Sequence, residues 1–189
     1  MQSFLVSAGL VALAEMGDKT QLLSFLLAAR LRKPWSIIAG ILVATLLNHT
    51  LAGVLGSLLA GWIPRTALIW TTGLAFIVFG LWTLHPDSIG DDLKLRKGSA
   101  FATTLIAFFM AEMGDKTQFA TIALAARFQA PFQVVLGTTA GMLLADVPAV
   151  WLGDKLSDRV PIRAVRIVAA LLFIAMGTVT LLSLTADRS

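Results

Sequence analysis

The chain has 189 residues, of which 57% are hydrophobic and 14% are charged, with a mean hydropathy of +0.83 and a formal net charge of +4. A soluble domain is far less apolar, so these values favour an integral membrane protein. The absence of cysteine excludes disulfides, thiolate metal sites and cysteine nucleophiles. The basic residues could suggest a nucleic-acid partner, but they lie in loops between apolar stretches, so none is expected.

Six apolar stretches are each close to the ~20 residues that cross ~30 Å of hydrocarbon as a helix. Taken in chain order, the expected transmembrane helices cover about 4–29, 35–60, 66–84, 100–127, 132–153 and 162–184. No Lys or Arg precedes the first stretch, which argues against a cleaved signal peptide. The predicted fold is therefore an all-α integral membrane protein with six transmembrane helices.

The first half of the chain recurs in the second half at a spacing of 97 residues. Residues 15–20 and residues 112–117 share the hexapeptide Glu-Met-Gly-Asp-Lys-Thr, and 27 of the 70 positions in 15–84 are identical in 112–181. We therefore predict two repeats of three helices, residues 1–84 and 100–189, joined by a linker at 85–99. No Walker loop or nucleotide fingerprint is present, so no nucleotide partner is expected.

Basic residues are distributed unequally between the two sides of the predicted membrane. The loops after the first, third and fifth spans hold ten of them: Arg30, Arg32, Lys33, Lys94, Arg96, Lys97, Lys155, Arg159, Arg163 and Arg166. The opposite side holds three, Arg65, Arg127 and Arg188. The excess predicts that the odd-numbered loops, with the linker, are cytoplasmic and that both termini are extracytoplasmic. Because each repeat has an odd number of spans, the second repeat is expected to be inverted.

Each hexapeptide places charged residues inside an apolar stretch, where ionisable side chains are costly and usually functional. Glu15 enters about eleven residues into its span, near the midplane at ~1.5 Å rise per residue. Glu112 reaches the same depth from the other side. On a continuous helix, Asp18 lies one i,i+3 step from Glu15, so the two carboxylates would share a face. Gly17 would weaken that helix locally.

Brought together, the two hexapeptides would form a site with a formal charge of about minus two, from four acids and two lysines. The acids are Glu15, Asp18, Glu112 and Asp115, and the lysines are Lys19 and Lys116. One divalent cation balances this charge, and oxygen ligands favour Mn²⁺, Ca²⁺ or Mg²⁺, of which Mg²⁺ loses water reluctantly. Further oxygen ligands would come from Thr20, Gln21, Thr117 and Gln118. Protons compete for the same acids, which predicts metal/proton exchange.

The two copies differ at two mid-membrane positions, where Asn48 and His49 align with Ala145 and Asp146. This asymmetry suits proton handling. Asp146 is a candidate fifth ligand or proton relay, because an unpaired acid within the membrane is costly. His49 is either a relay or a buried imidazole that bonds across helices, and Asn48 is a polar neighbour.

Four other interpretations of the chain remain. In a structural alternative, Glu15 with Lys19 and Glu112 with Lys116 are intrahelical ion pairs that make the spans tolerable in lipid. An intramembrane aspartyl protease also uses two embedded acids, although four acids with adjacent lysines suit a cation cage better. A lipid-embedded assembly factor would show no transport, and a passive cation channel would conduct without proton coupling.

The duplicated hexapeptide resembles the doubled Glu-x-Gly-Asp-Lys/Arg-Thr/Ser signature of the Golgi-type manganese/calcium–proton exchanger family. The resemblance extends over the whole chain. It implies a transporter rather than an enzyme, with six or seven transmembrane helices, no prosthetic group, and conserved acids that bind the transported ion. It assigns Glu15, Asp18, Glu112 and Asp115 to that ion. The short chain is similar to compact bacterial members, which implies manganese export across the inner (plasma) membrane, with calcium as the second candidate.

Overall fold

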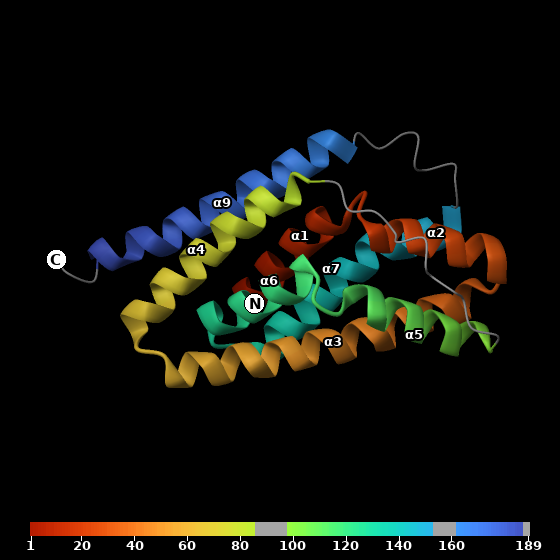
Figure 1. The fold of residues 1–189 in the computed structure, drawn as a ribbon, viewed down its shortest axis with the longest axis horizontal. Helices are drawn as coiled ribbons and strands as arrows, with labels where there is room; N and C mark the ends of the chain where they lie inside the picture. The colour runs from red at the N-terminus through yellow and green to blue at the C-terminus, as the bar shows by residue number, and fades with distance from the viewer. Residues whose placement is uncertain (86–97, 153–161, 187–189) are drawn as a thin grey trace.

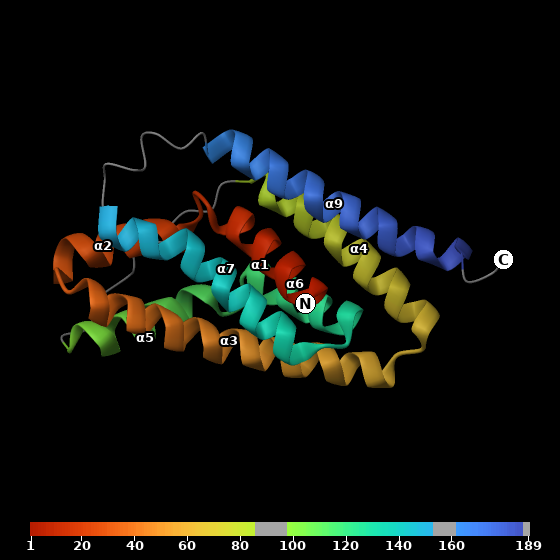
Figure 2. The same cartoon turned by 180° about the vertical axis from the view of Figure 1, so that it is seen from behind.

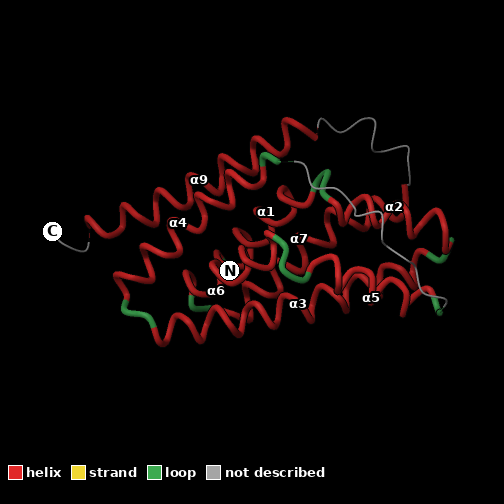
Figure 3. Tube along the Cα trace, viewed as in Figure 1, coloured by secondary structure: helices red, strands yellow, loops and turns green. Residues whose placement is uncertain are grey.

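The described part of the chain is entirely helical, as expected. The computed structural model describes residues 1–85, 98–152 and 162–186, so most of the predicted linker lies outside the described residues. The described ranges contain eight helices and no strand (Figures 1 and 3): α1 (Gln2–Glu15), α2 (Lys19–Leu31), α3 (Pro34–Trp62), α4 (Arg65–Thr83), α5 (Ala100–Glu112), α6 (Lys116–Phe128), α7 (Pro131–Leu152) and α9 (Ile162–Ala186).

Three of these helices, α3, α4 and α7, are long and apolar enough to cross a membrane, over Pro34–Trp62, Arg65–Thr83 and Pro131–Trp151. Large apolar side chains such as Leu51 and Leu144 are exposed on the outside, whereas the acids Glu15 and Glu112 are fully buried. An apolar exterior around a charged interior reverses the pattern of soluble proteins and requires lipid as the solvent. The chain is therefore a multi-pass membrane protein.

The stretches 4–29 and 100–127 are not single helices, which corrects the expectation of continuous spans. Helix α1 ends at Glu15 and α2 begins at Lys19, and α5 and α6 are separated in the same way. Gly17 and Gly114 adopt φ angles of 77° and 76°. This left-handed conformation is accessible to glycine at little cost and cannot continue a right-handed helix. The residues on both sides of each break are apolar, so a hydropathy profile does not reveal either break.

Helix packing repeats with the same 97-residue spacing as the sequence. A Cβ atom placed on Gly40 of α3 would lie 2.8 Å from Cβ of Thr104 in α5. One placed on Gly137 of α7 would lie 2.5 Å from the carbonyl oxygen of Phe4 and 3.0 Å from Cβ of Ser7, in α1. Glycine is therefore needed for close approach at both contacts. Each broken helix packs against the long helix of the other copy.

Helices α4 and α9 run side by side and antiparallel, as both Figure 1 and Figure 2 show. Gly73 meets the backbone of Gly177, and seven residues later Gly80 meets the backbone of Ala170, so the partner number falls as the residue number rises. Phe76 stacks on Phe173 in the same interface, with ring centroids 6.4 Å apart. The pair flanks the helices that carry the charged motifs.

Candidate metal centre

The two helix breaks determine where the acids of the hexapeptides lie. Glu15 and Glu112 are the last residues of α1 and α5, whereas Asp18 and Asp115 are the residues that precede α2 and α6. All four side chains are buried. Because a turn separates each Glu from its Asp, the i,i+3 helical geometry expected for Glu15 and Asp18 is wrong. In both copies the carboxylates instead stand on either side of a helix break.

Three acids from the two copies come close enough to share one ion. One carboxylate oxygen from each of Glu15, Asp18 and Asp115 lies within 4.8 Å of the other two. Carboxylate oxygens are the ligands that hard cations such as Mn²⁺ or Ca²⁺ prefer. Glu112 was expected in the same group and does not belong to this closest set within the described residues.

The two lysines pair with aspartates of the opposite copy. Lys19 Nζ lies 2.7 Å from Asp115 Oδ1, and Lys116 Nζ lies 2.8 Å from Asp18 Oδ2. These contacts replace the intrahelical Glu–Lys pairs of the structural alternative. Counting all four acids as ionised, the formal charge is −4 + 2 = −2. The crossed pairs therefore leave a formal charge of −2 on these six side chains, whose four acids are buried.

The two glutamates have different surroundings although their sequences are identical. Thr20 donates a hydrogen bond to Glu15 Oε2 at 2.5 Å, and Thr117 donates a short hydrogen bond to Glu15 Oε1. Thr117 is the repeat counterpart of Thr20, yet its hydroxyl reaches the glutamate of the other copy. No hydrogen-bond donor among the described residues reaches either oxygen of Glu112. The centre is thus symmetric in its Lys–Asp pairs and asymmetric in its Glu–Thr contacts.

The glutamines of the motif stabilise the helix breaks. The backbone N–H of Gly17 donates to Gln21 Oε1 at 2.8 Å, and that of Gly114 donates to Gln118 Oε1 at 2.8 Å. Gln21 also donates from Nε2 to the carbonyl of Ala145 at 3.1 Å, which ties the first break to α7. In this structure both side-chain carbonyls are occupied by backbone N–H groups.

The diverged positions lie on the long helices. Asp146 is fully buried, its Oδ1 accepts from Ser24 Oγ at 2.9 Å, and its Oδ2 has no donor among the described residues. Neither ring nitrogen of buried His49 has a hydrogen-bond partner in the described ranges. Asn48 donates to the carbonyl of Phe109 at 3.1 Å. Sequence reasoning missed Ser24, although a hydroxyl one helical turn after Thr20 could have indicated it.

Buried acids paired with lysines within apolar helices are typical of membrane proteins that move ions. A sequence model of a family described as "Divalent cation/proton antiporter GDT1" matches residues 3–91 and 100–188. The chain belongs to the GDT1 family. It is accordingly a transporter and not an enzyme, which excludes the alternative of an intramembrane protease.

Similar proteins occur in bacteria and plants. A Vibrio cholerae protein named "Putative manganese exporter" is 46% identical over 181 residues, which cover 95% of this chain and 90% of the relative. GDT1-like protein 5 of Arabidopsis thaliana is 30% identical over 222 residues, with 97% of this chain and 96% of the relative covered. No solved structure matches the chain.

Proposed function

We propose that this transporter exchanges cytoplasmic Mn²⁺ for external protons and so exports the metal, with Ca²⁺ as the second candidate ion. The observation that carries the proposal is the buried set of Glu15, Asp18 and Asp115 oxygens, all within 4.8 Å of one another. The name of the 46% identical bacterial relative supports manganese over calcium.

At the centre, Glu15, Asp18 and Asp115 supply carboxylate oxygens to the ion, and Glu112 is the fourth acid that joins when the ion binds. The crossed lysines offset two of the four charges, so one divalent cation neutralises the site. Protons bound to the same acids neutralise the site equally well. With either the metal ion or protons bound, the site can open to the other side of the membrane without moving an unbalanced charge through lipid. Asp146 is a fifth ligand or a proton relay next to this site.

The topology that we propose has six spans in two inverted repeats, residues 1–84 and 100–189, with the linker 85–99 on the cytoplasmic side. The antiparallel packing of α4 and α9 and the two separate stretches matched by the family model support this arrangement. In this topology each broken helix, α1 with α2 and α5 with α6, forms one span. The basic-residue excess supports extracytoplasmic termini in the plasma membrane of a bacterial cell.

The proposed function is tested with purified protein in liposomes that carry an imposed pH gradient. Uptake of Mn²⁺ and of Ca²⁺ is recorded together with internal pH. Exchange predicts that metal entry and proton exit occur together, and that collapsing the gradient stops net accumulation. Metal flux without a change in internal pH would instead identify a passive channel. Faster uptake of Ca²⁺ than of Mn²⁺ at equal concentration would reverse the proposed preference.

A further inference from the structure

Glu112 and Asn48 are buried polar side chains whose oxygen atoms the three-carboxylate set does not use. Both residues are fully buried. No hydrogen-bond donor in the described ranges reaches either carboxylate oxygen of Glu112 or the amide oxygen of Asn48. Buried oxygen atoms without a donor are costly and uncommon in folded proteins. Three such atoms on two residues therefore require a physical explanation.

One hydrogen bond places the Asn48 amide beside the end of α5. Asn48 Nδ2 donates to the carbonyl oxygen of Phe109 at 3.1 Å, and the same oxygen accepts the backbone N–H of Met113 at 3.1 Å. Met113 directly follows Glu112, so the Asn48 amide lies at the level of the peptide unit at which α5 ends. Only the nitrogen of an amide can donate to a carbonyl, which fixes the orientation of this group. Its oxygen remains an acceptor at the level of Glu112.

The counterpart positions of the first copy are arranged differently. Glu15, the counterpart of Glu112, accepts hydrogen bonds from two threonines. Ala145, the counterpart of Asn48, has no side-chain oxygen. The glutamate that has donors therefore lacks a neighbouring amide, whereas the glutamate that has no donor in the described residues is provided with one.

The chemistry of the two groups suits a hard cation. A carboxylate and an amide oxygen are both acceptors, so they can be bridged only by a cation or a proton. Both are oxygen ligands of the kind that Mn²⁺ and Ca²⁺ prefer. The charges of Glu15 and Asp115 act on Glu112, so the two groups adjoin the three-carboxylate set. With one carboxylate instead of three, they would hold a divalent ion more weakly, as suits an ion that must move on.

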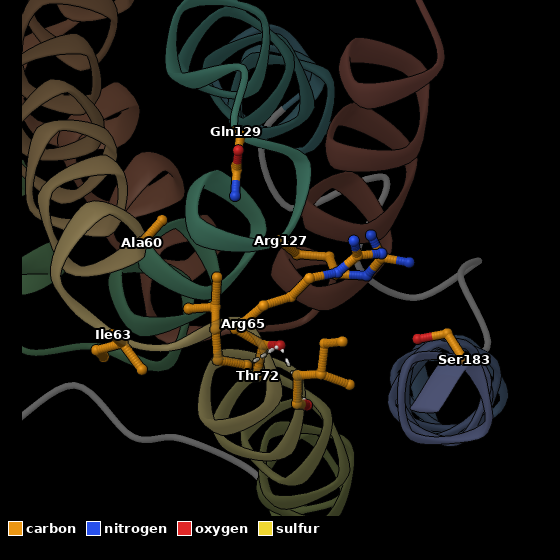
Figure 4. A pocket seen from close by; sticks show the side chains of 9 residues that line it. Ala60, Ile63, Arg65, Thr72, Arg127, Gln129 and Ser183 are labelled. Carbon is orange, nitrogen blue, oxygen red and sulfur yellow. Dashed lines mark hydrogen bonds between the residues drawn. The ribbon is translucent and has the colours of Figure 1, made fainter. Parts of the chain in front are cut away.

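The cavity of about 470 Å³ shown in Figure 4 does not extend to these groups. Of its lining residues on α3, Ala60 is the nearest to Asn48 in the chain, twelve residues away, or about 18 Å at 1.5 Å rise per residue. Glu112 does not line it. Asn48 and Glu112 are therefore enclosed by protein, where the attraction between an ion and an oxygen ligand is stronger than in water.

We propose that Asn48 Oδ1 and the Glu112 carboxylate form a second, weaker position for the transported divalent cation, next to the set of Glu15, Asp18 and Asp115. The ion occupies the two positions in turn, because two divalent ions at neighbouring positions would repel each other. Glu112 then accompanies the ion into the stronger set. This inference rests on the proposed function, to which it adds a second ion position and a neutral ligand from α3.

The test is equilibrium binding of Mn²⁺ to the purified full chain. Glu15→Gln removes a ligand from the stronger set, so the weaker position should account for the Mn²⁺ binding that remains. Adding Asn48→Leu should lower this remaining affinity about tenfold, because an oxygen contact to a charged group is lost. Adding Thr139→Val instead is the matched control and should change it by less than about twofold, since no partner of that hydroxyl is lost. Thr139 Oγ1 is also a buried oxygen without a hydrogen-bond partner in the described residues, and it lies on α7.

A further variant separates the oxygen of Asn48 from its N–H group. In the Glu15→Gln background, Asn48→Asp keeps an oxygen ligand but loses the donor to Phe109, so Mn²⁺ should bind at least as tightly as with Asn48. An equal fall in Asn48→Asp and Asn48→Leu would show that Asn48 acts through its bond to Phe109, and would overturn the proposal. Unchanged affinity in Asn48→Leu would also overturn it and would identify a proton between the two groups. If Asn48→Leu fails to purify as one species, Asn48→Ala, which copies the residue at position 145, takes its place with the same expectation.

The proposed function and the second position can fail separately, because the binding measurement needs no pH gradient. A wild type that moves Mn²⁺ without protons, together with the expected fall in Asn48→Leu, would contradict exchange and support the second position. A wild type that exchanges Mn²⁺ for protons, together with no remaining Mn²⁺ binding in Glu15→Gln, would overturn the second position alone.

Discussion

Lys19 of the first copy lies 2.7 Å from Asp115 of the second, and the counterpart pair, Lys116 with Asp18, lies at 2.8 Å. Each ion pair therefore joins one helix break to the other. Since α1 packs on α7 and α5 packs on α3, the two breaks are brought face to face by helices of the opposite copy. The charges that define the site also hold the two halves of the molecule together.

We expect Lys116→Met to destabilise the protein more than Lys19→Met. The Lys116 side chain is 5% exposed, whereas that of Lys19 is 23% exposed, so solvent reaches the Lys19 pair more than the Lys116 pair. Breaking a well-buried ion pair by removing one partner costs about 3–5 kcal/mol, and the greater exposure of Lys19 should place the cost for its pair below that for the Lys116 pair. Thermal unfolding in detergent measures the difference. Adding Asp18→Asn to Lys116→Met should recover part of the loss, and equal losses in both lysine variants would contradict the burial argument.

Thr117→Val should reduce metal-dependent proton movement by about tenfold, which corresponds to one lost hydrogen bond to a charged group. The hydroxyl of Thr117 donates to Glu15, whereas that of Thr121, one turn later on α6, donates only to the carbonyl of Thr117. Thr121→Val is therefore the control and should remain near the wild-type rate. Initial rates in liposomes compare the two. Equal rates in both variants would show that the Glu15 contact has no functional role.

Glu15→Gln and Asp115→Asn should each abolish metal flux and metal-dependent proton movement together. Both residues contribute to the three-carboxylate set, and neutralising one removes a ligand and a charge from a site that must balance a divalent ion. Asp92→Asn, in the predicted linker and outside the described residues, should change neither quantity. Normal flux with normal pH dependence in the two site variants would make these acids structural.

Gly114→Ala should destabilise the protein by about 1–2 kcal/mol and slow transport, because an L-residue is strained in the left-handed region. No atom lies within 4 Å of the added Cβ, so the effect comes from the backbone φ of +76° and not from crowding. Gly9→Ala is the matched control. The added Cβ also meets open space, but residue 9 lies within α1, where alanine is preferred to glycine. The free energy of unfolding should fall in the first variant only. A neutral Gly114→Ala would mean that the break forms without its positive φ.

A cysteine introduced at position 2 should react with membrane-impermeant reagents from outside the cell, and one at position 92 from the cytoplasm. The chain contains no cysteine, so each label reports a single site. The expectation follows from the excess of basic residues in the odd-numbered loops. Selective labelling of position 2 from the cytoplasm would reverse the proposed orientation and the proposed direction of export.

The sequence by itself determines the membrane environment, the helical class and the family. Composition and hydropathy are sums over the chain, so they do not depend on which residues meet, and the repeated hexapeptide is visible without coordinates. The sequence also singles out the charged residues, because ionisable side chains in apolar stretches are costly wherever the helices pack. Their assignment as an ion site, and the repeat boundaries, stay predictions.

Only the tertiary structure decided how those residues meet. Hydropathy cannot distinguish a continuous span from α1 and α2 separated at Gly17, since the break depends on one backbone φ. The pairing of Lys19 with Asp115 depends on contacts between residues 96 positions apart, which local spacing cannot specify. Identical hexapeptides cannot reveal that Thr20 and Thr117 both bind Glu15 while Glu112 receives no donor from the described residues. The long helices also contact the two copies differently, since Gln21 and Ser24 bond to Ala145 and Asp146 of α7, whereas Asn48 of α3 bonds to the carbonyl of Phe109.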